Sequence, residues 1–130
     1  MNLKIVLKGR AITKKNSSQI IKAGNRRMLI PSAQYKQYEK DCLQQIPPKA
    51  KQRIDIPVNV QCRYYMPTRH RVDLVNLMEA TMDILVKAGV LEDDNCRIVC
   101  SHDGSYVDYD KHNPRVEITI NSYHGITFGG

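Results

Sequence analysis

Three segments of the chain alternate strictly between apolar and polar residues, and this pattern restricts the fold most. Residues 2–8, 56–66 and 115–120 each place apolar side chains in one row and polar side chains in the other. A period of two is typical of strands that bury one face. Because the apolar face of a sheet needs a covering layer, we expect one sheet with helices packed on one face.

One of those helices is expected over residues 73–88. At about 100° per residue, its apolar residues fall on one broad arc and its polar residues on the other. Asp73 stands at the N-cap position, and Gly89 stands where a glycine commonly ends a helix. Asn76 lies in the first turn, on the polar arc with Asp73.

The other helix is expected to begin after Ser32, as N-cap, and to run to about residue 45. Residues 20–30 favour a β-hairpin with a basic tip, and 96–102 favours a strand with Ile98 and Cys100 on its inner face. The sequence thus predicts a single α+β domain over 1–120. Its sheet is mixed or mainly antiparallel, with two helices on one face, and 121–130 forms a weakly ordered tail.

The balance of charge favours a polyanionic partner. The chain has 20 basic and 13 acidic residues and a net charge of +7, which favours nucleic acid, although a basic charge alone is weak evidence. No apolar run approaches the ~18 residues of a membrane span, and no secretory signal is present, so we expect a cytoplasmic protein with no membrane partner. Four cysteines without a C-x-x-C pair are interpreted as reduced thiols.

Acidic residues gather around the helix at 73–88 despite the basic total. Three lie on its polar arc and three follow its end: Asp73, Glu79, Asp83, Glu92, Asp93 and Asp94. A solvated helix face is the ordinary interpretation of such a pattern. Clustered carboxylates repel one another unless a cation lies among them, however, and Mg²⁺ prefers oxygen ligands. We therefore expect a metal site here.

The segments Asp73-Leu74-Val75-Asn76-Leu77 and Gly89-Val90-Leu91-Glu92-Asp93-Asp94, with their spacing, resemble the RusA family of Holliday junction resolvases. The resemblance extends to Arg69 and Arg71 before the first segment, to Asp83, and to the order of elements from 2 to 120. It implies a small, often prophage-borne endonuclease of DNA recombination and repair. Such an enzyme depends on Mg²⁺, with Mn²⁺ as a possible substitute, needs no small-molecule cofactor, and resolves four-way DNA junctions by paired nicks as a homodimer.

The first segment departs from the pattern Asp-x-Asp-Asn-Leu that is common in this family. Val75 stands where the second aspartate would be, and valine binds no metal. The resemblance implies Asp73 and Asp94 as catalytic metal ligands, supported by Asp93. Our hypothesis is that Glu79 or Asp83, on the polar arc, replaces the missing ligand, and that Asn76 supports the site. The competing hypothesis is a degraded site that binds branched DNA without cutting it.

Phosphate contacts are expected from basic residues of the polar loop after the first strand, of the hairpin and of the segment before the helix: Lys14, Lys15, Arg26, Arg27, Arg69 and Arg71. For the hairpin, a solvated turn is an equally good interpretation. His70, between two arginines, is interpreted as a DNA or solvent contact, and His102 as structural.

The length of the helix bears on assembly. Sixteen residues span roughly 24 Å, whereas the five residues from Gly89 to Asp94 reach at most ~17 Å. Asp94 would then not return to Asp73 within one chain, so we infer a site shared across a two-fold dimer. A third function, a metal-dependent phosphatase of small molecules, is disfavoured by the basic charge and by the lack of a glycine-rich phosphate loop.

Overall fold

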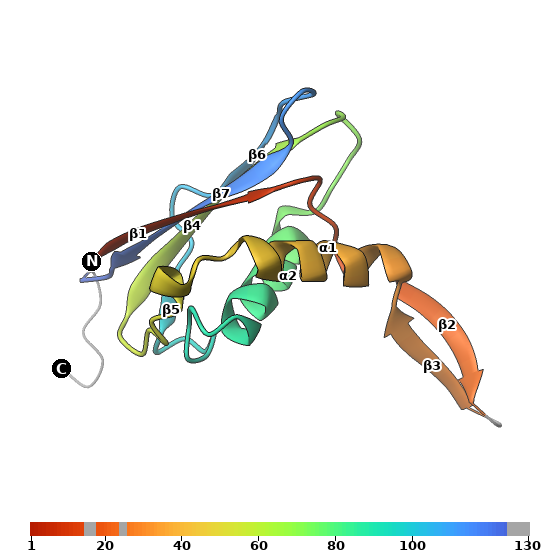
Figure 1. The fold of residues 1–130 in the computed structure, drawn as a ribbon, viewed down its shortest axis with the longest axis horizontal. Helices are drawn as coiled ribbons and strands as arrows, with labels where there is room; N and C mark the ends of the chain where they lie inside the picture. Colours follow the sequence, from red (N-terminus) through yellow and green to blue (C-terminus); the bar gives the residue numbers. More distant parts are fainter. Residues whose placement is uncertain (15–17, 24–25, 125–130) are drawn as a thin grey trace.

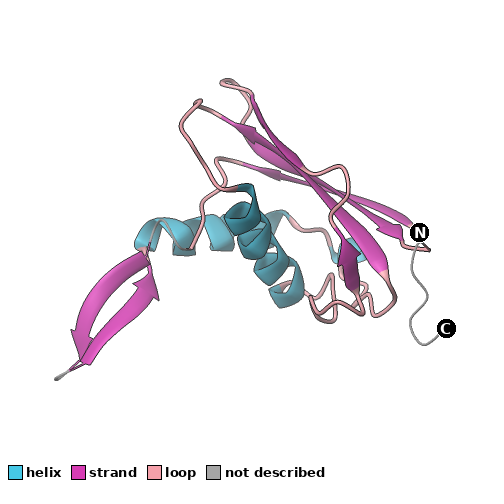
Figure 2. Ribbon diagram, turned by 180° about the vertical axis from the view of Figure 1, so that it is seen from behind, coloured by secondary structure: helices cyan, strands magenta, loops and turns pink. Residues whose placement is uncertain are grey.

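The structure of the chain, a computed structural model, describes residues 1–14, 18–23 and 26–124, with only the backbone for 18–23 and 26–31. A five-stranded mixed sheet carries two helices on one face, and a separate two-stranded hairpin extends beyond the helices (Figures 1 and 2). This arrangement confirms the predicted α+β class with both helices on the same face.

The sheet is built around strand β4 (Val58–Met66) and its neighbour β7 (Arg115–Ser122). β7 runs antiparallel to β4 on one side and to β1 (Asn2–Lys8) on the other. The opposite edge of β4 pairs in parallel with two short strands, first β5 (Val99–Ser101) and then β6 (Tyr106–Tyr109). The sheet is therefore mixed, with its parallel pairs confined to one edge.

The alternation in the sequence sets the register of the sheet. Paired residues form rows of buried side chains across β1, β7 and β4, namely Ile5, Ile118 and Cys62, and Leu7, Val116 and Tyr64. Helices α1 (Ala33–Gln45) and α2 (Leu74–Lys87) cover this face, and a 3-10 turn follows α1 at Pro48–Ala50 (Figure 2). The expected N-caps, Ser32 and Asp73, are both confirmed.

A buried polar contact joins α2 to the middle of the sheet. The Thr81 Oγ1 donates to the carbonyl oxygen of Leu77 at 2.9 Å, and the Tyr64 hydroxyl lies 2.6 Å from the same Oγ1. Since the one proton of Thr81 is used within the helix, the Tyr64 hydroxyl is the donor in the second contact. This contact fixes the rotation of α2 on the sheet, so its acidic arc faces outward.

Two details of the sheet differ from the sequence expectation. The strand expected at 96–102 is only Val99–Ser101, because the backbone oxygen of Asn95 accepts from the backbone N–H groups of both Ile98 and Val99 and closes a turn there. Cys100 is accordingly only half-buried, although Ile98 is buried as expected. Strand β6 was not expected at all, since its residues are largely exposed and carry no alternating apolar pattern.

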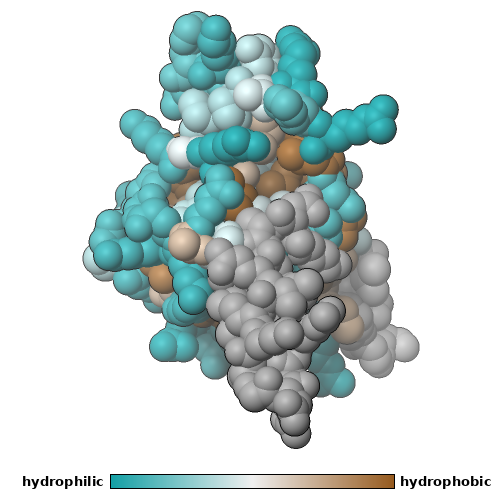
Figure 3. All heavy atoms as spheres, turned by 90° about the vertical axis from the view of Figure 1, so that its right-hand side faces the viewer, coloured by the Kyte–Doolittle hydropathy of each residue, from teal (hydrophilic) through white to brown (hydrophobic). Residues whose placement is uncertain are grey.

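The ends and the hairpin complete the description. β7 continues to Ser122, two residues beyond the expected end, and residues 125–130 lie outside the described part of the chain. The hairpin is confirmed as β2 (Ser18–Ala23) and β3 (Arg26–Pro31). The described surface at this end is mostly hydrophilic (Figure 3). Among the described residues, no helix is long and apolar enough to cross a membrane.

Candidate active site

The turn after α2 reverses the chain and brings the second acidic segment back along the helix. Gly89 adopts a φ of 80°, the left-handed conformation that glycine accepts without a steric penalty. The backbone N–H of Val90 donates to the carbonyl of Leu85, and that of Gly89 donates to Val86. This pair of hydrogen bonds is the Schellman motif, and it ends the helix where the glycine predicted.

The segment that follows α2 is hydrogen-bonded to the loop before β4. The backbone N–H groups of Arg53 and Ile54 donate to the carbonyls of Gly89 and Val90, each at 2.9 Å. Val90 and Leu91 are fully buried, so this stretch forms part of the core. The acidic residues that follow it are therefore attached to a rigid support.

Asp93 shapes the turn that presents Asp94. One of its carboxylate oxygens accepts from the backbone N–H of Asp94 at 2.7 Å, and the other accepts from the side-chain amide of Asn95 at 3.1 Å. These hydrogen bonds hold the pKa of Asp93 below its usual value, the contact from the Asp94 backbone having the largest effect. Asp93 is itself exposed, and its hydrogen bond to the Asp94 backbone sets the position of Asp94.

A hollow of about 290 Å³ lies between α2 and this returning segment. We call it the carboxylate hollow, and it is lined by Val75, Met78, Glu79, Met82, Asp94, Val99 and His102. Glu79 comes from the middle of α2 and Asp94 from the acidic pair after it. Ten residues of helix separate Gly89 from Glu79, about 15 Å, which is within the reach computed from the sequence for Asp94.

The carboxylate hollow concentrates negative charge. Partial loss of water contact raises the pKa of Asp94, and the carboxyl group of Asp93 and the charge of Asp83 raise it further. Asp83 itself is engaged by Lys14, whose Nζ lies 2.9 Å from its carboxylate. A cation placed beside Asp94 would therefore relieve repulsion among these acids.

Val75 is an apolar residue in an acidic setting. It lines the carboxylate hollow and is 64% exposed, so packing gives little reason for its identity. The position that the family pattern gives to a second aspartate therefore does face this hollow. A carboxylate there would lie with those of Glu79 and Asp94.

Asp73 caps the first turn of α2, where its Oδ1 accepts from the backbone N–H of Val75 at 3.0 Å. Neither Asp73 nor Asn76 lines the carboxylate hollow, but Val75 does, so Asp94 returns to the first turn of α2 within one chain, contrary to the expectation from the sequence. Within the described ranges, no three His, Cys, Asp or Glu side chains gather closely enough to hold a metal. The pair Glu79 and Asp94 still fits Mg²⁺, which usually takes one or two carboxylates and completes its shell with water or phosphate.

His102 is a further member that sequence reasoning treated as structural. Its Nδ1 lies 2.8 Å from the carbonyl oxygen of Val60. Because a carbonyl only accepts, Nδ1 carries the proton, and Nε2 of the neutral ring remains a proton acceptor. The ring is thus anchored to β4 and also lines the carboxylate hollow. No local pattern around His102 could have indicated this.

The predicted phosphate contacts lie at several places. Lys14 is held by Asp83 and lies 5.6 Å from the centre of the Tyr35 ring. Arg71 lines a different hollow, of about 200 Å³, together with Arg10. Arg69 stacks on the ring of Tyr109. Lys15 lies outside the described residues. Arg26 and Arg27 lie in β3, where only the backbone is described.

Comparison with known protein families gives a match over most of the chain. The family of the endodeoxyribonuclease RusA matches residues 6–121, a span that holds both helices and both acidic segments. A search of curated proteins found no significant match to the sequence. Since the family match covers most of the chain, this protein belongs to the RusA family of endodeoxyribonucleases.

Proposed function

We propose that this protein is a Mg²⁺-dependent endonuclease that resolves four-way DNA junctions by paired nicks. Membership of the RusA family implies Holliday junction resolvase activity, and nucleases of this family generally use a divalent metal. The observation that carries the proposal is the carboxylate hollow, which Glu79 and Asp94 both line on the surface of an otherwise basic chain.

In this proposal Glu79 and Asp94 hold the metal, and Asp83 adds negative charge beside them. A divalent cation there supplies a Lewis acid that lowers the pKa of water and stabilises charge on the phosphate oxygens. Asp93 orients Asp94 through the turn hydrogen bond at 2.7 Å. His102, with its Nδ1–H fixed on the Val60 carbonyl, offers Nε2 as a proton acceptor in the same hollow.

Basic side chains would hold the DNA against this hollow. The contact between Lys14 and Asp83 keeps an ammonium group beside the acidic arc, where it would be available to a DNA phosphate. Arg71 lies just before the N-cap of α2 and is exposed. Together these charges would supply part of the salt-dependent affinity that protein–DNA contacts show.

The proposed assembly is a homodimer, because a four-way junction offers two equivalent strands to a two-fold enzyme. Asp73 is exposed and does not line the carboxylate hollow of its own subunit. Its proposed catalytic role is therefore to complete the hollow of the partner subunit, in addition to capping α2. The dimer thus supplies the ligand that Val75 does not.

One observation favours a second candidate, a branched-DNA-binding protein of the same fold that does not cut. Val75 occupies the position of an expected ligand, and the described residues bring only two carboxylates into the carboxylate hollow. Such a protein would bind a junction equally well with and without metal.

A nicking assay on a synthetic four-way junction tests the proposal. Wild-type protein is incubated with Mg²⁺ or with EDTA, beside Glu79→Gln and Asp94→Asn variants. The matched control is Glu92→Gln, which removes an exposed acid that does not line the carboxylate hollow. We expect symmetric nicks only with Mg²⁺, lost in both hollow variants and kept in the control. Binding without nicks under every condition would favour the second candidate.

A further inference from the structure

Another hollow lies where the parallel strands β4 and β6 end, and it shares no residue with the carboxylate hollow. Its volume is about 450 Å³, and it is lined by Pro67, Thr68, Arg69, His70, Tyr109 and Lys111. We call it the basic hollow. A smaller hollow of about 200 Å³ adjoins it and adds Val107 and Asp108 to the lining.

The guanidinium of Arg69 is held over an aromatic ring in the basic hollow. Its central carbon lies 4.4 Å from the centre of the Tyr109 ring, within the range of a cation–π contact. The N–H donors of a guanidinium lie in its plane, so stacking on one face leaves them available for hydrogen bonds. Among the described residues, neither Arg69 nor Lys111 forms an ion pair with an acid.

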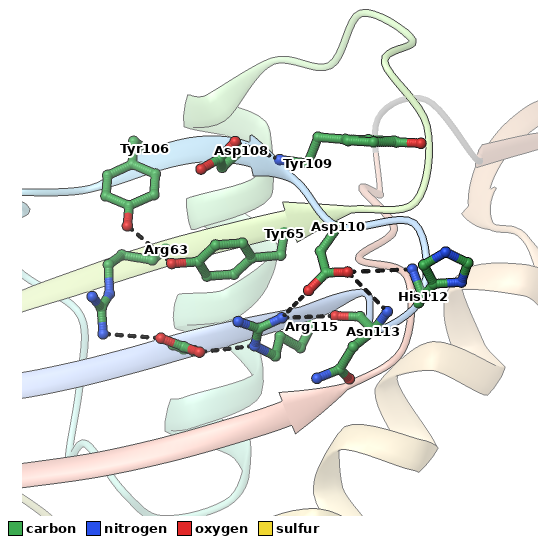
Figure 4. A network of polar contacts seen from close by, with 10 residues as sticks. Arg63, Tyr65, Tyr106, Asp108, Tyr109, Asp110, His112, Asn113 and Arg115 are labelled. Atoms are coloured by element: carbon green, nitrogen blue, oxygen red, sulfur yellow. Dashed lines mark hydrogen bonds and ion pairs between the residues drawn. The ribbon is translucent and has the colours of Figure 1, made fainter.

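The turn that carries Tyr109 and Lys111 is fixed by a network of polar contacts (Figure 4). The backbone N–H of Asp110 donates to the carbonyl of Met66, which continues the pairing of β6 with β4. The Asp110 carboxylate accepts from the backbone N–H groups of His112 and Asn113, each at 3.2 Å, and from Arg115 at 2.9 Å. In Figure 4 the Tyr109 ring points away from this network, toward the loop after β4.

The charge around the basic hollow is positive. Arg69 and Lys111 contribute two cations, and His70 adds an imidazole ring to the lining. On the acidic side, Asp108 lines the adjoining hollow and accepts from the backbone N–H of Tyr109 at 2.8 Å. The charge of Asp110 is neutralised by its ion pair with Arg115. The balance suits a singly charged phosphodiester.

We propose that the basic hollow binds a backbone phosphate of the junction DNA outside the cleavage site. Arg69 and Lys111 contact the phosphate, and Tyr109 is a positioning residue that holds the Arg69 guanidinium. Six residues separate Arg69 from Val75, which lines the carboxylate hollow, and they span at most about 20 Å. The two hollows therefore lie close enough on the surface for one DNA junction to contact both. This inference rests on the proposed function for the identity of the DNA.

Binding measured without catalysis tests this subsite. Fluorescence anisotropy of a labelled four-way junction is followed in EDTA, across a series of salt concentrations. For Lys111→Ala, loss of one phosphate contact should reduce the slope of log K against log salt by about 1, and raise the Kd about three- to tenfold. The matched control is Lys51→Ala, another exposed lysine that follows the 3-10 turn Pro48–Ala50 and does not line the basic hollow, and it should leave the slope unchanged.

The role of Tyr109 is tested by a conservative pair of variants. Tyr109→Ala should raise the Kd about two- to fivefold, the size expected for an exposed cation–π contact, and Tyr109→Phe should restore wild-type binding. In an Arg69→Ala background, Tyr109→Ala should have no further effect. Thermal unfolding by circular dichroism shows which variants are folded.

The outcomes separate the subsite from the function on which it rests. Equal slopes for the Lys111 and Lys51 variants, or equal losses for Tyr109→Ala and Tyr109→Phe, would overturn the subsite while junction nicking by the wild-type protein continued. A wild-type protein that neither bound nor nicked the junction would overturn the proposed function, and the inference with it.

Discussion

The substitution Val75→Asp tests whether the carboxylate hollow binds a metal ion, because it adds a carboxylate to the lining. Val75 is 64% exposed, so roughly a third of its side chain is buried, and removing that contact costs about 0.5–1 kcal/mol. An aspartate in the first turn of α2 gains about 0.3–1 kcal/mol from the helix dipole. Repulsion from Glu79, one turn away, costs about 0.2–0.5 kcal/mol. The stability of the variant without metal should thus change by no more than about 1 kcal/mol.

With metal present, the same substitution should have a larger effect. A third carboxylate in the carboxylate hollow should tighten Mn²⁺ binding by at least about tenfold, which corresponds to about 1.4 kcal/mol. Isothermal titration calorimetry measures the affinity, and denaturant unfolding with and without Mn²⁺ measures the linked stabilisation. Val75→Asn is the control, since its side chain has the same shape without the charge. If both variants bound Mn²⁺ with equal affinity, position 75 would not face the metal.

Three further outcomes are expected. Mixing Asp73→Asn with Asp94→Asn subunits should restore nicking, because a shared site regains one intact set of ligands in the mixed dimer; no restoration would mean that each site belongs to one subunit. Hydrogen bonding to Arg115 lowers the pKa of Asp110, so its stabilising contribution is present above the unfolded pKa of about 3.9 and is lost as the pH falls through the lower folded value. Asp110→Asn should flatten that acid limb of urea unfolding, and an unchanged limb would contradict the ion pair. Tyr64→Phe should cost about 1 kcal/mol in the same assay, because the buried hydroxyl contact with α2 is lost, and no loss would show that this contact does not stabilise α2 on the sheet.

The sequence predicted those parts of the fold that leave a periodic or local signal. The rows of buried side chains in β1, β4 and β7 follow directly from the alternation, and the ends of α2 follow from Asp73 and Gly89. β6 left no such signal because its side chains are mostly exposed. Its place is set by backbone pairing with β4 instead.

The candidate site was predictable in its residue types but not in its geometry. The acids stood out against a basic chain, but which of them meet depends on the reversal after Gly89 and on the contacts of that segment with the loop before β4. For the same reason His102 was missed, since it reaches the carboxylate hollow from a different strand edge. The stacking of Arg69 on Tyr109 joins residues far apart in the chain, and periodicity carries no information on such a contact.

In the proposed function, Glu79 and Asp94 of one subunit hold the divalent cation that nicking requires. Calorimetric titration of Mn²⁺ into the wild-type protein, Glu79→Gln, Asp94→Asn and the Glu92→Gln control measures this directly. Both hollow variants should lose at least about tenfold in affinity, or about 1.4 kcal/mol each, while the control should bind Mn²⁺ as the wild type does. Wild-type affinity in the Glu79→Gln, Asp94→Asn double variant would show that these two carboxylates do not hold the cation.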